Sequence, residues 1–315
     1  MSPPDFAVAR LRADGGEGAR SEEFFRSAEF LEAEGTTHTL TIERGASRVA
    51  IPLLVREIDG TERSLDATSP YSYPGGEVIG EPIEPAEIDW SATGLVSVFI
   101  RDRLGEPTAL AGARERSIVL VSDPELPRKS RMSDRQQIRK NEADGYQVRD
   151  LAGTETTAEQ RAVFLGVYTA TMAHVKASER YMFDAGYFDL LFRSPRSRLF
   201  IAHGPRGDVA AAAITVISDG FLHYYLSGTA DEHRRRAPSK NLIVAVTDYA
   251  EGLGLPMNLG GGVKPGDGLE EFKRGFANAE LPFRTHELIA DPPRYAELCA
   301  GRGDDGFFPL YRSPR

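Results

Sequence analysis

The sequence predicts a mixed α+β (mixed α/β) chain of two tandem domains, each a mixed, mostly antiparallel sheet flanked by helices. A length of 315 residues is roughly twice a typical domain of about 150, so two separate cores are expected. Short β-rich runs follow one another across Gly, Pro and Asp turns, which is typical of antiparallel strands. Helical segments do not follow every strand, unlike those of a doubly wound sheet.

The first half contains one amphipathic helix followed by a series of strands. Its Phe, Ala and Leu residues recur at helical spacing before Gly35. The dipeptide Asp59-Gly60 indicates a hairpin, and DATSPYSYPGG, residues 66–76, is expected to be a loop. A basic helix that ends at Gly145 closes the half. The expected helices cover residues 21–34 and 133–143, and the expected strands cover residues 37–43, 48–58, 61–65, 94–101 and 117–122.

The second half begins with helical segments and continues as a three-strand meander. Gly204-Pro205 and Asp219-Gly220 separate the strands of the meander. A short strand then leads into the turn Gly260-Gly261-Gly262. The first expected helix begins at residue 159, and three more cover 187–192, 241–252 and 269–277. The expected strands cover 198–203, 209–218, 221–227, 256–259 and 283–289. We place the domains at residues 1–148 and 149–292, with 293–315 as a tail packing back on the body.

Composition restricts the class of protein and its partners. The chain is 41% hydrophobic and 27% charged, without an apolar run of the roughly 20 residues that a membrane span needs. We therefore expect a cytoplasmic globular protein. One cysteine and six dispersed histidines predict no metal site. The net charge of −9 means that a polyanion such as RNA would need a local basic patch.

Four segments carry a family resemblance. They are SPYSYPGG at 69–76, IRKNEADG at 138–145, YYLSGTADEHRRRAPSKNLI at 224–243 and LGGGVKPGDGLEEFKRGF at 259–276. The order of helices and strands in the second half is typical of the GNAT acyltransferase fold. Together these features resemble the Fem family of GNAT-like aminoacyl-tRNA-dependent transferases, over roughly residues 65–280. The resemblance implies two GNAT-like domains, with the acceptor on the N-terminal side and the donor on the C-terminal side.

The resemblance implies transfer of an amino acid from aminoacyl-tRNA to the amine of a small acceptor, without a bound cofactor. That chemistry needs a group that stabilises an oxyanion and a route for the amine proton. Lys273 is expected beside the reacting carbonyl, with Phe272 at the wall of the site. A solvated helix lysine and a core phenylalanine are the structural alternatives.

The expected acceptor side lies around residues 66–76. The Asp66 carboxylate could accept the proton of the attacking amine, or could simply form a turn. Tyr71 and Tyr73, with Ser69, are expected to contact the acceptor. That acceptor would be a natural-product intermediate, such as a peptidyl nucleoside antibiotic, or a peptidoglycan precursor.

Basic residues are candidates for tRNA phosphates. We expect Arg234, Arg235, Arg236, Arg139 and Lys140 to bind them, with a solvated charged loop as the alternative. The arginine run lies where GNAT enzymes bind the pyrophosphate of coenzyme A with a glycine-rich turn. Here Ala237-Pro238-Ser239 replaces that turn, and proline has no amide hydrogen to donate.

Two other function classes remain open. The chain could be a GNAT N-acetyltransferase that uses acetyl-CoA, or a GNAT-like module that binds a ligand without catalysis. No DNA partner is expected, and the oligomeric state is left open.

Overall fold

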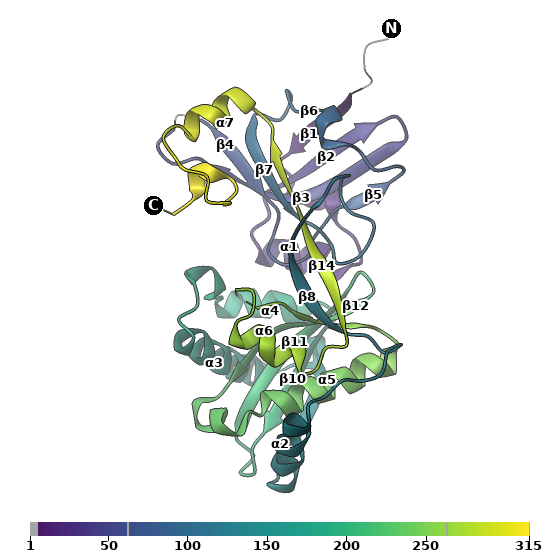
Figure 1. Ribbon diagram of the computed structural model, residues 1–315, viewed down its shortest axis with the longest axis vertical. Coiled ribbons are helices and arrows are strands. Elements are labelled where there is room, and N and C mark those ends of the chain that lie inside the picture. Colours follow the sequence, from purple (N-terminus) through teal and green to yellow (C-terminus); the bar gives the residue numbers. More distant parts are fainter. Residues whose placement is uncertain (1–5, 62, 263, 315) are drawn as a thin grey trace. The chain divides into compact units, whose positions relative to one another are not determined.

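The computed structural model describes residues 6–61, 63–262 and 264–314. The chain forms two compact units (Figure 1). Unit 1 comprises residues 1–116 together with 282–315, and unit 2 comprises residues 117–281. These divisions differ from the sequence-based boundaries at 148/149 and 292/293. The reason is strand pairing, because β8 (Arg114–Ser122) pairs with a strand of unit 2 and β14 (Ala279–Ile289) pairs with a strand of unit 1.

Unit 1 is built on a mixed, mostly antiparallel sheet. The strand order is β6-β1-β2-β3-β4-β7-β14, with β5 paired to β3. Only the pairs β1–β6 and β4–β7 are parallel within this order. Its elements are β1 (Ala7–Arg12), α1 (Ala28–Ala33), β2 (His38–Arg44), β3 (Ser47–Glu57), β4 (Leu65–Thr68), β5 (Glu77–Ile79), β6 (Ile88–Asp89), β7 (Leu95–Arg101) and α7 (Pro292–Leu298).

The core of unit 1 comes from alternate residues of these strands. Leu40, Ile42, Ile51, Leu53 and Val98 are fully buried on one face. Side chains two positions apart in a strand share a face, so the alternation in the sequence places them together. The predicted helix at 21–34 is shorter than expected, because only α1 is α-helical and Ser27 caps it by accepting from the Phe30 amide.

Unit 2 has a six-stranded sheet in the order β8-β13-β12-β11-β10-β9. Among the strands that the structure describes in this sheet, only β12 and β13 pair in parallel, and helix α5 forms the crossover between them. The elements are α2 (Met132–Ala143), β9 (Gln147–Ala152), α3 (Ala158–His174), α4 (Ala185–Arg193), β10 (Ser197–His203), β11 (Val209–Ser218), β12 (Phe221–Thr229), the 3-10 helix η6 (Asp231–Arg236), α5 (Ser239–Leu253), β13 (Met257–Gly260) and α6 (Gly268–Arg274).

Helices cover both faces of this sheet. Helix α5 packs its apolar residues Leu242, Val246 and Ala250 on one face, in a cluster that also holds Phe200 of β10. Helices α3 and α4 cover the other face, where α3 packs on β11 and β12 and α4 packs on β10. The two helices contact each other through aromatic rings, with 5.1 Å between the centroids of Phe164 and Phe188. The mixed, mostly antiparallel sheets predicted from the sequence are confirmed. None of the helices in the described part of the chain is both long and apolar enough to cross a membrane.

Candidate active site around Lys273

Lys273 lies on α6, opposite the glycine turn that follows β13. Its Nζ donates a hydrogen bond to the carbonyl oxygen of Gly261 over 2.8 Å. Gly260 has a φ angle of 73°, which only glycine adopts readily. At Gly261 a side chain is excluded for a different reason, because a Cβ there would lie 2.8 Å from the carbonyl oxygen of Ile118. The triple glycine therefore lets the main chain approach both β8 and the lysine. Sequence analysis predicted the turn and the helix, and both are present.

The amino group of Lys273 is in a poorly solvated position. Burial lowers the pKa of Lys273 to about 8, against an opposing influence from the Asp267 carboxylate, which favours the charged form. Asp267 caps α6 by accepting from the Glu270 amide over 2.8 Å. An ammonium group with two remaining donor hydrogens can stabilise a developing negative charge here, and its neutral form can accept a proton.

Phe272, the predicted wall of the site, is half-buried at the edge of the unit 2 core. Its ring lies 5.6 Å from that of Phe276 between centroids. This contact favours the packing alternative, and a role for Phe272 in the site stays a prediction.

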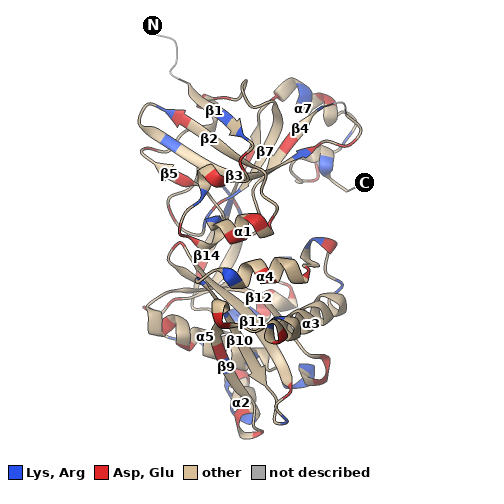
Figure 2. Ribbon diagram, turned by 180° about the vertical axis from the view of Figure 1, so that it is seen from behind, with Lys and Arg blue, Asp and Glu red and all other residues tan. Residues whose placement is uncertain are grey.

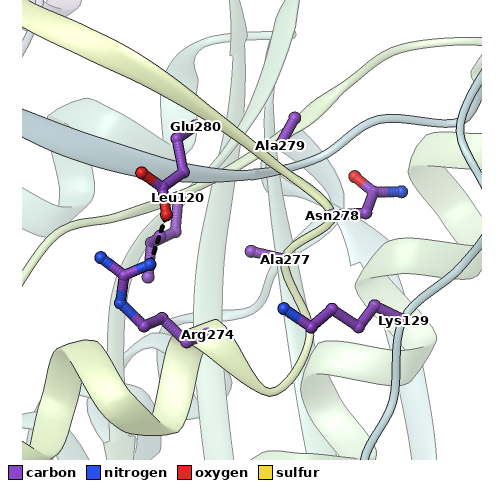
Figure 3. Close-up of a pocket in the computed structure, with 7 residues that line it drawn as sticks. All are labelled: Leu120, Lys129, Arg274, Ala277, Asn278, Ala279 and Glu280. Atoms are coloured by element: carbon purple, nitrogen blue, oxygen red, sulfur yellow. Dashed lines mark hydrogen bonds and ion pairs between the residues drawn. The ribbon is translucent and has the colours of Figure 1, made fainter.

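A small cavity of about 190 Å³ lies beside the C-terminal end of α6 (Figure 3). Figure 3 shows Lys129 and Arg274 among its lining residues, with Arg274 bound to Glu280. Arg274 also contacts Glu270, whose Oε1 lies 2.6 Å from the guanidinium. The exposed Lys129 has no ion pair within the described ranges, so it is the one lining cation whose charge is available.

The predicted phosphate-binding residues divide into those with a carboxylate partner and those without one. Arg234 contacts Asp231 over 2.7 Å, and Arg236 contacts Asp144 over 2.7 Å. Arg139, Lys140 and Arg235 are exposed and form no ion pair in the part of the chain that the structure describes.

Helix α2 and the arginine run are neighbours in unit 2. The Nδ2 of Asn141, which is fully buried, donates to the carbonyl oxygen of Arg236 over 2.9 Å. Figure 2 shows both positive and negative residues on α2, so this helix does not offer a uniformly positive face. Among the predicted phosphate-binding residues, Arg139, Lys140 and Arg235 are therefore those whose charge has no carboxylate partner in the described part of the chain.

The turn before α5 has few free amide groups. The amide of Ala237 donates to Arg234, and the amide of Lys240 donates to Ala237, each over 3.0 Å. Pro238 has no amide hydrogen. A helix N-terminus binds phosphate through free amides, so this turn is poorly suited to a pyrophosphate group.

The predicted proton acceptor, Asp66, belongs to unit 1. It lies in β4, where sequence analysis expected the beginning of a loop, and its side chain is fully buried. The carboxylate contacts Arg56 over 3.0 Å and Arg312 over 2.5 Å, and it accepts from the Tyr311 hydroxyl over 3.1 Å. These contacts favour a structural role for Asp66, and its proposed catalytic role stays a prediction.

The predicted acceptor-binding residues also belong to unit 1. Buried Ser69 accepts from the Arg101 amide through Oγ over 2.8 Å. The Tyr71 amide donates to Glu34 over 2.9 Å, and the Tyr73 ring lies 5.4 Å from that of Phe283 between centroids. Both tyrosines are half-buried. Their roles toward an acceptor stay predictions.

Two groups of hydrogen-bonded polar side chains in unit 2 were not predicted from the sequence, and each contains a buried histidine. One joins Asp208, His233 and Tyr146, in which each ring nitrogen of His233 is bonded over 2.8 Å. The other joins His223 and Asn258 beside the glycine turn. The members of each group come from segments that lie apart in the sequence, so no local pattern indicated that they meet. No group of three or more potential metal-ligating side chains occurs among the described residues.

Comparison with known proteins defines the class of fold. Residues 128–274 match the model of the "Acetyltransferase (GNAT) domain" family. A crystal structure of FemX matches with a TM-score of 0.62 at 11% identity, covering 90% of this chain and 96% of that one. No curated protein matches the chain in sequence.

Two further solved structures have the same fold. L-PGS from Bacillus licheniformis matches with a TM-score of 0.55 at 12% identity, covering 82% of this chain and 86% of that one. The C-terminal domain of a putative lysylphosphatidylglycerol synthetase from Agrobacterium fabrum gives 0.56 at 14%, covering 90% and 93%. Residues 128–274 thus match a GNAT domain model, and the chain as a whole is similar in fold to FemX.

Proposed function

We propose that this protein is an aminoacyltransferase that moves an amino acid from aminoacyl-tRNA to the amine of a small acceptor. The observation that carries the proposal is the position of Lys273, an amino group with a lowered pKa held against the glycine turn of a GNAT domain. Solved structures with this fold include proteins named FemX and lysylphosphatidylglycerol synthetase.

The proposed reaction needs no nucleophile from the protein. The acceptor amine attacks the ester carbonyl carbon of the aminoacyl-tRNA, and a tetrahedral oxyanion forms. The Lys273 ammonium stabilises that charge through the donor hydrogens that Gly261 does not use. The intermediate then collapses, the ribose hydroxyl leaves with a proton, and the new amide nitrogen loses one proton to a base.

Two observations support aminoacyl-tRNA as the donor: the exposed positive charges and the backbone amides of the turn before α5. The three unpaired basic residues Arg139, Lys140 and Arg235 offer contacts to tRNA phosphates. The turn at Ala237-Pro238 offers few free amides to a pyrophosphate. Both observations favour tRNA over coenzyme A as the carrier of the acyl group.

An acetyl-CoA-dependent N-acetyltransferase is the second candidate. One observation favours it, since the matching family is described by acetyltransferase activity. It requires a pyrophosphate site, for which the turn before α5 is poorly suited.

The acceptor is proposed to be a natural-product intermediate, such as a peptidyl nucleoside antibiotic, or a peptidoglycan precursor. Ser69, Tyr71 and Tyr73 are the proposed acceptor contacts, because tyrosine rings suit small-molecule sites. Asp66 is the proposed proton acceptor, a role that requires its ion pairs with Arg56 and Arg312 to open. We place the protein in the cytoplasm, where charged tRNA is found.

A donor assay tests the proposal directly. The purified protein is supplied with a total pool of tRNA charged with labelled amino acids, in parallel with labelled acetyl-CoA, and with a panel of amine acceptors. Phosphatidylglycerol vesicles are included because one solved structure with this fold is named as a domain of a putative lysylphosphatidylglycerol synthetase. Transfer that ribonuclease abolishes supports the proposal. Ribonuclease-resistant transfer from acetyl-CoA alone would establish the second candidate instead.

A further inference from the structure

A buried polar pair lies beside the candidate site, on the neighbouring parallel strands β12 and β13. His223 is opposite Asn258 in the strand register, and each side chain is only 2% exposed. The proposed reaction does not use either residue. Polar groups buried in this way cost free energy unless they are hydrogen-bonded, so their partners indicate what they do.

The donor and the acceptor of each hydrogen bond of this pair can be assigned. His223 Nε2 lies 3.2 Å from the carbonyl oxygen of Ser218, which can only accept, so Nε2 carries the proton. Burial lowers the pKa of His223 to about 4, and the ring is therefore neutral near pH 7. Its Nδ1 accepts from Asn258 Nδ2 over 3.0 Å. This fixes the orientation of the Asn258 amide group.

The fixed amide reaches the glycine turn. Asn258 Oδ1 accepts from the backbone amide of Gly260 over 2.7 Å. The next residue, Gly261, presents its carbonyl oxygen to the Nζ of Lys273 over 2.8 Å. One continuous series of hydrogen bonds thus runs from β11 through His223 and Asn258 to the turn that holds the lysine.

We infer that Asn258 and His223 are positioning residues of the candidate site, which hold the Gly260–Gly261 turn so that Lys273 is kept at the reacting carbonyl. As a statement about catalysis, this inference rests on the proposed function. As a statement about Lys273, it stands on the hydrogen bonds alone. An apolar pair would fill the same space between the strands, but it would leave the turn without its acceptor.

Lysine titration tests the inference without an activity assay. The chain has six lysines, so isotope-labelled lysine gives a spectrum in which Lys273 can be assigned by comparison with Lys273→Met. In Asn258→Leu, the loosened turn should let water reach Nζ, and the Lys273 titration midpoint should rise by about one pH unit toward its ordinary value. Asn141→Leu is the matched control, since buried Asn141 contacts Arg236 and Asn241 rather than the turn.

A second pair of variants covers the case in which Asn258→Leu does not fold. His223→Gln keeps an acceptor for Asn258 and a donor for Ser218, whereas His223→Leu keeps neither. The Lys273 midpoint should rise in His223→Leu and stay near the wild-type value in His223→Gln. Equal midpoints in His223→Leu, Asn258→Leu and the wild type would overturn the inference.

Activity measurements distinguish a failure of this inference from a failure of the proposed function. If transfer from aminoacyl-tRNA occurs, His223→Leu should lower kcat while KM for the donor is unchanged, because the turn holds Lys273 and not the tRNA. If the Lys273 midpoint responds as expected and no donor supports transfer, the proposed function fails and the positioning of Lys273 stands. If transfer occurs and the midpoint does not respond, only the inference fails.

Discussion

Asp66 and Arg312 form an ion pair across 246 positions of the sequence, with 2.5 Å between Arg312 Nε and Asp66 Oδ2. The carboxylate is fully buried, whereas the Arg312 side chain is 23% exposed. The same carboxylate contacts Arg56 of β3. It therefore joins the C-terminal segment to the interior of the unit 1 sheet.

This arrangement predicts a loss of stability in Asp66→Asn. An uncharged amide should lower the free energy of unfolding by about 2 kcal/mol, less than for a fully buried pair because both arginines are partly exposed. Chemical denaturation measures the loss, with the exposed Glu22→Gln as the neutralising control. Unchanged stability together with a large loss of kcat would instead favour Asp66 as the proton acceptor.

Lys273→Met should abolish most of the transfer activity. Removing one donor to an oxyanion lowers kcat by about 10² to 10³, and Met keeps the length of the side chain without its charge. Steady-state kinetics with charged tRNA measure this, and Lys264→Met, at an exposed lysine of the loop that precedes α6, is the control. Full activity of Lys273→Met would remove the lysine from the mechanism.

Activity should fall as the pH rises through about 8. The pKa of Lys273 is lowered to about 8, so the ammonium form predominates below that pH and is lost above it. Lys273→Arg should remove this alkaline decrease, because a guanidinium stays charged, although the activity itself would be lower. A pH–kcat profile that rises through pH 8 would mean that the neutral amine is the active form and accepts a proton.

Neutralising Arg139, Lys140 and Arg235 together should weaken donor binding in a salt-dependent way. Each lost phosphate contact reduces the slope of log KM against log salt by roughly 1, so a triple alanine variant should lose about 2 to 3. Three arginines on strands β1 and β3 of unit 1, Arg10, Arg12 and Arg48, provide a control with the same change of charge. Equal slopes for both triple variants would place the tRNA elsewhere.

Periodicity predicted most of the strands and helices that surround the site. The meander, the glycine turn and α6 lie within a few residues of their expected bounds, because alternation and turn residues are local signals. β1 and β9 were missed, since their pattern is weak: β9 has only half-buried and exposed residues. The unit boundaries depend on which distant strands pair, which local patterns do not determine.

The candidate site was predicted only in part. The family resemblance led to Lys273, and the structure adds the carbonyl that it contacts. The resemblance could not show that Arg234 and Arg236 have carboxylate partners, or that Asp66 is enclosed by arginines, because ion pairs form between segments far apart in the sequence.

The division of unit 1 between residues 1–116 and 282–315 has a consequence for biosynthesis. During translation, the first 116 residues leave the ribosome long before β14, the strand that completes their sheet beside β7. They also precede Tyr311 and Arg312, whose side chains bind the Asp66 carboxylate. The whole of unit 2 is synthesised in between as one uninterrupted segment. Unit 2 should therefore fold before unit 1, although the first 116 residues of unit 1 are synthesised earlier, because their sheet lacks β14 until unit 2 has been made.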